Sequence, residues 1–401
     1  MYLNARPPYR LAASLLTLTA ALTGCGGGTE KTPSTPPPSG QISVNFVSPA
    51  ETNNVHDLGA PVPLLANVNI NGNFAPNGTP VTLTLDPSSS ASVAPTAPTT
   101  VNGIAAAELR SRTLGRLTAR AMTMSSSYTA SDELTLYIRP TPKDLGVLVP
   151  AYFSAGTKSP WVDLIYASKV SHPDVAVTAI VKPATGVDTN GIVTAADADL
   201  STNITDFTAS ANHKVIAYVS TISGSGTRSV ADIKAIIDSY ISYYPSLNGF
   251  FLDEMGTGTS QRPFYSDIYT YIKGLAPTME VIGNPGTFPD SSYAELATMA
   301  ADVLVTFEGN AASYQNIDPQ PSSTWVYSKP NSAQAMLVHS ASTCTAMQEA
   351  LKTAAAARTN TGWVYVTDQP VGSPWSALPS YWTKLLGTVD ARNKNRTLPA
   401  C

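Results

Sequence analysis

The feature that most constrains this fold is a regular alternation of short apolar runs with helix-forming segments over residues 145–391. Eight runs are apolar on both faces, as are strands of a parallel sheet that helices cover. The predicted strands are 146–152, 175–181, 215–219, 249–252, 280–283, 303–307, 335–338 and 363–366. The 247 residues that contain them match the roughly 250 of a (β/α)8 barrel. We therefore predict an α/β fold, a closed TIM-like barrel.

Two helices of this stretch have clear signals. A capping box of Ser229 and Asp232 begins one, and Pro245 ends it. Residues 346–357 form the second, which is rich in Ala. The sixth crossover is less regular, because residues 325–327 can also form a short strand. An open doubly wound sheet is the rival fold, but no Gly-rich phosphate-binding motif follows the first strand.

Residues 41–139 have a different rhythm, in which apolar and polar residues alternate between turns rich in Pro, Gly, Asn and Ser. The clearest strands are 42–46, 64–70, 81–85, 105–109, 117–121 and 134–138. About seven short strands in roughly 100 residues favour a β-sandwich. The sequence around 103–109 and 114–121 also resembles bacterial Ig-like domains. We predict a small all-β Ig-like sandwich that serves as a spacer, with a glycan-binding module as the alternative.

An export signal opens the chain. Arg6 and Arg10 precede an apolar run, 11–22, that is too short to cross a bilayer but fits the core of a signal peptide. The run leads into Leu-Thr-Gly-Cys, which resembles a bacterial lipobox. We predict that residues 1–24 are removed and that Cys25 is acylated, which anchors the protein in a membrane.

The predicted anchor is followed by a tether. Residues 25–40 comprise the lipidated cysteine and a segment rich in Gly, Pro, Ser and Thr without core-forming side chains. Gly26, rather than Asp, follows the cysteine, which favours the outer membrane. We therefore expect a lipid-anchored protein of the cell envelope, on the periplasmic face or at the cell surface.

Composition and cysteines narrow the classes of protein. A net charge of −4 without any Lys/Arg cluster argues against nucleic-acid binding. Cys344 and Cys401 can pair in an oxidising compartment and pin the C-terminal tail, 392–401, or they can remain separate thiols. We expect a monomer that uses no cofactor and no metal.

Polar groups follow nearly every predicted barrel strand. Active sites of such barrels lie at the carboxyl ends of the strands, where side chains from different strands converge. Here those ends carry Tyr152, Lys182, Ser220, Asp253 with Glu254, Asn284, Glu308, His339, and Thr367 with Asp368. This convergence predicts a binding or catalytic site more strongly than any one residue does.

Three acids stand out among these groups. Asp253 and Glu254 end a strand that is otherwise apolar, and Glu308 follows another such strand. Buried unpaired carboxylates are costly, so a place in the core is a poor explanation. Two carboxylates from different strands facing one pocket are what glycoside hydrolysis requires. The alternative is that these acids only cap the following turns and helices.

The remaining candidates have a structural and a functional interpretation. His339 either hydrogen-bonds substrate or satisfies the core, and no second His or Cys lies at ligand spacing for a metal. Asn284 either forms a turn or belongs to a substrate-binding loop. Aromatic residues suited to stacking on pyranose rings are Tyr152, Tyr218, Trp375 and Tyr381.

Several stretches resemble one known family in content and order. They are Val149–Phe153, Ala217–Thr221 with Gly226–Arg228, Asn248–Glu254, Gly283–Thr287, Phe307–Glu308, Val364–Asp368 and Leu378–Trp382. The resemblance is to the spherulation-specific family 4, or spherulin 4-like, proteins. It implies a (β/α)8 glycoside hydrolase that cuts α-1,4-linked galactosamine polymers. It places the carboxylate pair on Asp253 and Glu308, with Glu254 as an accessory acid.

The sequence thus predicts a surface or periplasmic glycoside hydrolase acting on an amino-sugar exopolysaccharide. In this hypothesis Asp253 is the nucleophile and Glu308 the acid/base of a retaining reaction. The predicted substrate-binding residues are Tyr152, Lys182, Tyr218, Ser220, Asn284, His339, Asp368 and Trp375. Two other classes remain open, a non-catalytic polysaccharide-binding surface lipoprotein and a structural lipoprotein.

Overall fold

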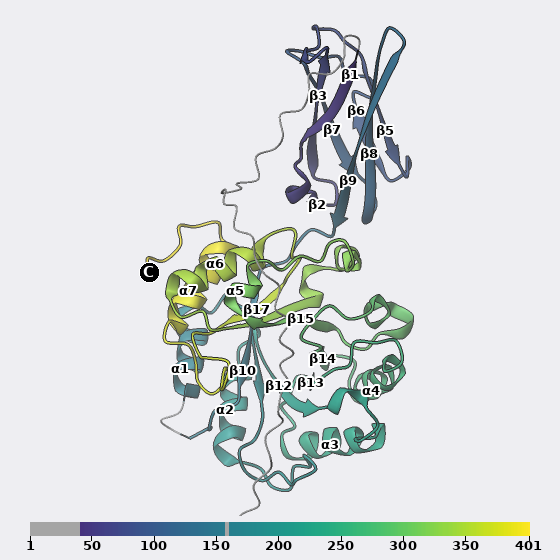
Figure 1. Cartoon of the computed structure of the whole chain (residues 1–401). Coiled ribbons are helices and arrows are strands. Elements are labelled where there is room, and N and C mark those ends of the chain that lie inside the picture. The colour runs from purple at the N-terminus through teal and green to yellow at the C-terminus, as the bar shows by residue number, and fades with distance from the viewer. Residues whose placement is uncertain (1–40, 157–159) are drawn as a thin grey trace, which may run out of the picture.

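The computed structural model describes residues 41–156 and 160–401, in an N-terminal all-β part and a C-terminal barrel (Figure 1). The predicted signal peptide, Cys25 and tether lie outside these residues. None of the described helices has both the length and the apolar character needed to cross a membrane.

The N-terminal part consists of two sheets packed face to face. One holds β1 (Ile42–Ser48), β3 (Pro61–Ile70), β7 (Ile104–Ser111) and β6 (Ala91–Ala94) in that order, with β4 (Asn73–Phe74) beside β3. The other holds β2 (Val55–Asp57), β9 (Tyr128–Arg139), β8 (Gly115–Ser125) and β5 (Val81–Asp86). Alternate residues of both sheets, such as Val68 and Ala121, fill the core between them. All six strands predicted from the alternation are present. The strands β2, β4 and β6 are too short for an alternation to identify them.

The C-terminal part is a closed parallel barrel, as predicted. Its strands are β10 (Gly146–Ala151), β11 (Val177–Val181), β12 (His213–Ser220), β13 (Gly249–Asp253), β14 (Glu280–Gly283), β15 (Val303–Asn310), β16 (Gln334–His339) and β17 (Trp363–Val366). Pairing of β10 with β17 closes the ring. The predicted fold class, a TIM-like barrel preceded by an all-β unit, is confirmed.

Helices cover the outside of the barrel. They are α1 (Pro160–Tyr166), α2 (Ala198–Thr208), α3 (Val230–Tyr243), α4 (Arg262–Leu275), α5 (Ala311–Tyr314), α6 (Cys344–Ala355) and α7 (Trp382–Asn393). The capping box of Ser229 and Asp232 begins α3 as predicted. Residues 325–327, where the sequence also allows a short strand, form part of the 3-10 helix η6 (Thr324–Ser328). Its Val326 and Tyr327 are fully buried in a cluster with Val55 and Tyr137 of the sandwich, instead of pairing in a sheet.

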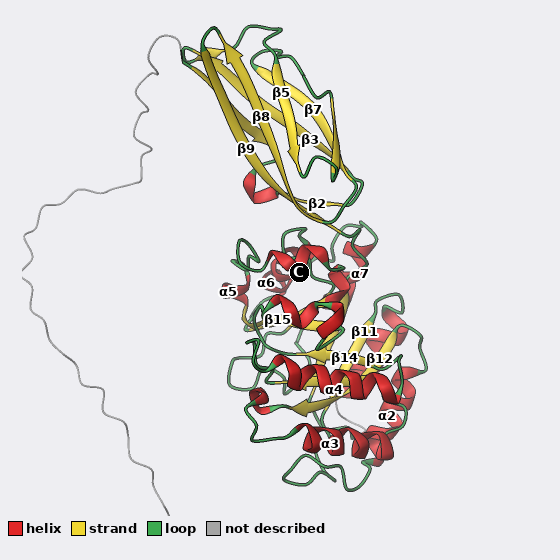
Figure 2. Cartoon of the chain, turned by 90° about the vertical axis from the view of Figure 1, so that its right-hand side faces the viewer, coloured by secondary structure: helices red, strands yellow, loops and turns green. Residues whose placement is uncertain are grey.

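The sandwich contacts the amino-terminal end of the barrel, and the two parts stack end to end (Figure 2). Arg139, the last residue of β9, pairs with Asp57 and donates to the carbonyl of Ala357 and to Asn360. Most barrel residues of this junction lie in segments that lead into β10, β16 and β17. The carboxyl ends of the strands therefore lie away from the sandwich.

Side-chain amides fix the linker that joins the two parts. Asn331 exchanges two hydrogen bonds with the main chain of Lys143, and Asn393 does the same with Leu145. Both asparagines thus replace the sheet partners that an extended linker lacks. Because the linker is held at two points, the sandwich is fixed to the barrel and does not hang from a free hinge.

The C-terminal tail is also tied to the barrel. A disulfide joins Cys344, the first residue of α6, to Cys401, so the structure contains the pairing that spacing alone left open. Gln348 and Lys384 hydrogen-bond to main-chain carbonyls of the same tail. A cross-link of this kind restricts the unfolded chain and thereby stabilises the fold.

Candidate active site

The end of β13 presents the first two acids. Asp253 is the last residue of the strand, and its carbonyl accepts hydrogen bonds from the amide and the hydroxyl of Thr221. The next residue, Glu254, has a left-handed backbone with φ of 55°. Non-glycine residues adopt this conformation at some cost, so it marks a constrained turn. The turn sends the Glu254 side chain to the hydroxyl of Ser220, at 2.5 Å, rather than toward Asn284.

Asn284 links the two carboxylates that the sequence singled out. Its amide nitrogen donates to Asp253 Oδ1 at 2.7 Å and to Glu308 Oε2 at 2.6 Å. Its side-chain oxygen accepts from the amide of Gly286, which fixes the orientation of the amide group. A buried side chain that donates to two acids at once brings like charges together, and a fold rarely does this for stability alone.

Glu308 reaches the site because β15 is irregular. The register of β15 on β16 shifts between Val305 and Phe307, and such bulges re-aim the residues that follow. The main-chain amide of Glu308 also donates to the carbonyl of Gly286, so the loop after β14 fixes the main chain at Glu308. Glu308 consequently lies at the mouth, where solvent still reaches it.

The surroundings of Glu308 suit a proton donor. Burial raises the pKa of the Glu308 carboxyl, and the negative charge of Asp253 raises that pKa further. Hydrogen bonds from Asn284 and Trp375 act in the opposite direction, because they stabilise the carboxylate. Glu308 is nevertheless an exposed residue near the end of its strand, so solvent can still reach it. An acid with a raised pKa can hold a proton near neutral pH and deliver it to a substrate.

Two tyrosines line the other side of Asp253. Tyr218 hydrogen-bonds to Asp253, and its ring meets that of Tyr152 edge-on at a centroid distance of 5.4 Å. Burial and the nearby acid raise the pKa of both tyrosine hydroxyls, so both stay protonated as donors. The exposed Lys182 holds its ammonium 4.8 Å from the centre of the Tyr218 ring. A second cation, Arg228, donates to the carbonyl of Ser220 beside Glu254.

The loop after β17 closes the site from the opposite side. Its Trp375 hydrogen-bonds to Glu308 and packs against His339 with ring centroids 6.3 Å apart. His339 is buried, which lowers its pKa, and its Nδ1 lies 2.9 Å from the Ser340 hydroxyl. This histidine supports the loop and the tryptophan rather than standing free in the mouth.

Two predicted residues have structural partners. Asp368 binds the amide and hydroxyl of Ser380 and so anchors the loop that carries Trp375. Tyr381 is buried and donates to the carbonyl of Ala341, which leaves no face for a sugar. The stacking role considered for Tyr381 is therefore wrong, because helix packing covers the ring.

Residues that the sequence did not single out also help to position the site. The Tyr265 hydroxyl, from α4, contacts the Thr221 hydroxyl and accepts from the amide of Gly256. Together these groups hold the turn that follows Asp253. Thr221 falls inside one of the motifs quoted above, but nothing in the sequence around Tyr265 distinguishes it from a core aromatic of α4.

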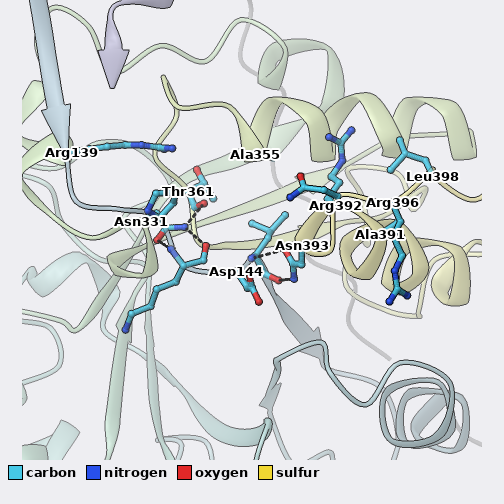
Figure 3. Close-up of a pocket in the computed structure, with 14 residues that line it drawn as sticks. Arg139, Asp144, Asn331, Ala355, Thr361, Ala391, Arg392, Asn393, Arg396 and Leu398 are labelled. Atoms are coloured by element: carbon cyan, nitrogen blue, oxygen red, sulfur yellow. Dashed lines mark hydrogen bonds between the residues drawn. The ribbon is translucent and has the colours of Figure 1, made fainter. Parts of the chain in front are cut away.

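Another concave surface of the described chain is not a comparable site. A groove of about 640 Å³ lies at the amino end of the barrel, beside the linker and α7. Figure 3 shows Arg139 on one side of it and Arg392 and Arg396 on the other, so their guanidinium groups do not converge. Asn331 and Asn393 are already engaged with the linker. We find no group of three His, Cys, Asp or Glu at metal-binding distance in residues 41–156 and 160–401.

Comparison with known families decides the relationship. Residues 146–389, which include the whole site, match the family described as spherulation-specific family 4. The chain belongs to this family. Over 256 residues it is 30% identical to spherulin-4 of Physarum polycephalum. This alignment covers 62% of this chain and 70% of the relative.

The chain is also similar to solved structures of other proteins. Sph3 of Aspergillus clavatus, crystallised in complex with GalNAc, is 20% identical with a TM-score of 0.49, over 62% of this chain and 98% of that one. A family 39 glycoside hydrolase from Bacteroides cellulosilyticus is 9% identical with a TM-score of 0.39, over 88% of this chain and 83% of that one.

Proposed function

We propose that this protein is a glycoside hydrolase that cleaves an amino-sugar exopolysaccharide, of the α-1,4-galactosaminan kind, by a two-carboxylate retaining mechanism. The observation that carries the proposal is the shared hydrogen bonding of Asp253 and Glu308 to one nitrogen of Asn284. The two bonded oxygens cannot lie farther apart than the sum of those bonds, about 5.3 Å. Retaining glycosidases hold their carboxyl groups about 5–5.5 Å apart, and inverting ones roughly 6.5–9.5 Å.

Each carboxyl group has one role in the proposed reaction. The Glu308 carboxyl protonates the glycosidic oxygen as the Asp253 carboxylate attacks the anomeric carbon, which breaks the glycosidic bond and leaves the sugar covalently attached to Asp253. Glu308, now a carboxylate, takes a proton from water, and the resulting hydroxide displaces Asp253 from the anomeric carbon. Asn284 orients both acids throughout, and the raised pKa of Glu308 favours the first proton transfer.

The lining of the site supports a sugar substrate with basic groups. Tyr218 and Trp375 flank the two acids and offer ring faces and polar tips suited to pyranose rings. The three acids Asp253, Glu254 and Glu308 outnumber the two cations at the mouth, Lys182 and Arg228, which favours encounter with a cationic amino-sugar polymer. Glu254, paired with Ser220, is the candidate for contact with an amino group.

We also propose that the protein works as a monomer in the cell envelope, lipid-anchored through Cys25 and oriented by its sandwich. The lipobox-like sequence before Cys25 and the polar tether up to residue 40 support this location. The tether and the sandwich place the barrel at a distance from the membrane, where a polysaccharide can reach it.

The test is to incubate the purified chain with partly acetylated and fully deacetylated α-1,4-galactosaminan and to size the products. Proton NMR of the first product should show the α anomer, because a double displacement retains configuration. An initial β product would replace the retaining mechanism with an inverting one. Binding to either polymer without any release of reducing ends would favour the non-catalytic polysaccharide-binding lipoprotein instead.

A further inference from the structure

One end of the sandwich is uncharged. This end comprises residues 70–81, 95–104 and 121–131, which are three loops with the strand ends beside them and contain no Asp, Glu, Lys, Arg or His. A β-bridge between Pro80 and Thr99 and a hydrogen bond from Thr123 to the carbonyl of Pro80 connect the three loops. We call these three segments the tip. The tip is the end of the sandwich farthest from the barrel (Figure 2).

Large apolar side chains stand exposed on this tip. Phe74 is 67% exposed, Val101 62%, Met124 60% and Tyr128 50%. Single exposed apolar residues are normal on a soluble protein. Four such residues lie at one end of the sandwich, in segments that carry no charge. The free energy of transferring this end from water to an apolar environment is therefore favourable.

The described chain begins at this same end. Gln41 accepts a hydrogen bond from the amide of Asn71, which lies in the tip. Fifteen residues lie between Cys25 and Gln41, and even when fully extended the chain from Cys25 to Gln41 spans no more than about 55 Å. An acyl group on Cys25 would therefore hold the tip close to the bilayer surface, at a high effective concentration.

We propose that the tip inserts Phe74, Val101, Met124 and Tyr128 into the interfacial region of the bilayer that holds the Cys25 anchor. This inference rests on the proposed anchor and is independent of the catalytic assignment. Tyr favours the membrane interface, where its hydroxyl stays hydrated while its ring is buried, and Phe is among the apolar residues that interfacial helices bury there. Because the loops are uncharged, insertion desolvates no ion.

The tip contact would also orient the enzyme. Strand β9 runs from Tyr128 at the tip to Arg139 at the junction, a length of about 40 Å for a strand of its size. The sandwich is fixed to the amino end of the barrel through Arg139 and the linker amides. A seated tip therefore directs the carboxyl ends of the strands, with Asp253 and Glu308, away from the lipid.

The experiment uses the acylated mature chain in vesicles of phosphatidylethanolamine and phosphatidylglycerol, followed by hydrogen exchange and mass spectrometry. Mass spectrometry of the N-terminal peptide first confirms that Cys25 carries acyl chains. Peptides of the tip should exchange at least threefold more slowly than in the unacylated Cys25→Ser chain free of vesicles. Peptides of β5 and β8 outside the tip, residues 82–86 and 115–120, should be unchanged and serve as the internal reference.

A variant with Phe74, Val101, Met124 and Tyr128 all changed to Ser should lose this protection while turnover of polysaccharide stays unchanged. The matched control changes the exposed apolar residues Val170 and Leu296, away from the tip, to Ser and should keep the protection. Tip exchange that is the same on and off vesicles would overturn the proposal. Protection that follows protein concentration in solution would assign the tip to a second copy of the chain and would equally overturn it.

Discussion

The two ends of the barrel both gather buried polar side chains, but they use them differently. At the amino end, Arg139 pairs with Asp57 while Asn331 and Asn393 bind main-chain groups of the linker, so each charge or amide meets a complementary partner. At the carboxyl end, Asn284 instead draws two acids together. The first arrangement lowers the free energy of the fold, whereas the second holds two acids close together where solvent reaches Glu308.

This difference distinguishes a structural cluster of polar side chains from a catalytic one, whatever the size of the groove beside it. The groove at the amino end is roomy, but its cations point apart and its amides are engaged. The site at the carboxyl end is recognised by like charges held close and by the raised pKa of Glu308. Groups with perturbed pKa values that face solvent mark functional sites more reliably than volume does.

The largest expected effect is on turnover at the carboxyl end. Asp253→Asn and Glu308→Gln should each lower kcat by at least about 1,000-fold, because each removes a group that exchanges a bond or a proton with substrate. Reducing-end assays on galactosaminan would measure the loss. Thermal unfolding of both variants should be unchanged or slightly higher in Tm, since like charges are removed. A large fall in Tm instead would show that the pair is structural.

Asn284→Ala should lower kcat by roughly 100-fold, as does loss of one preorganised donor in other active sites. The variant also removes a hydrogen bond that stabilises the Glu308 carboxylate, so the pKa of Glu308 should rise. Glu308 must be protonated for the first step, and the basic limb of the pH profile of kcat/KM should therefore move to higher pH. A limb that moved to lower pH would contradict the role of Glu308 as acid.

At the amino end, Arg139→Met should lower stability and leave kcat unchanged. Breaking a buried ion pair costs about 3–5 kcal/mol, but Asp57 is partly exposed, so about 2 kcal/mol is expected. Urea unfolding would measure the change. Arg110→Met is the control, because its pair with Glu108 is exposed and should be worth less than about 0.5 kcal/mol. If the two variants lost equal free energies of unfolding, the Arg139 ion pair would contribute no more to stability than an exposed ion pair does.

Glu254→Gln should have a smaller effect, a fall in kcat/KM of about tenfold or less. Glu254 bonds to Ser220 and not to Asn284, so its loss leaves the bridged pair intact. The fall should be larger on deacetylated than on acetylated polymer if Glu254 meets an amino group. A Glu254→Gln variant more damaged than Asp253→Asn would reverse the assignment of roles.

The smallest expected effect concerns acid stability at the amino end. His213, at the start of β12, stacks on Phe207, and burial together with the charge of Lys169 lowers its pKa to about 4. The unfolded chain binds a proton near pH 6.5, so stability should fall as pH drops from about 6.5 toward 4, by roughly 1 kcal/mol between pH 7 and pH 5. Urea midpoints at pH 7 and pH 5 would show it. In His213→Asn the difference should shrink, and an unchanged difference would assign it elsewhere.

Much of the fold could be predicted from the sequence, because its signals are local. Apolar runs located all eight barrel strands, and the capping box located α3. The structure of the segment Trp325–Tyr327 could not be predicted, because its side chains are buried against the sandwich, which lies far away in the sequence. The same limit applies to Tyr381, whose burial depends on the packing of α7.

By itself the sequence determined which residues stand at the carboxyl ends of the strands, since alternation and strand length fix where each apolar run stops. Only the tertiary structure decided which of these residues meet. Asn284 bridges Asp253 and Glu308 because β13, β14 and β15 are neighbours in a closed ring and a bulge in β15 turns Glu308 inward. Glu254 is turned aside by a left-handed backbone that no propensity predicts. Such contacts join residues distant in sequence, and packing alone sets their geometry.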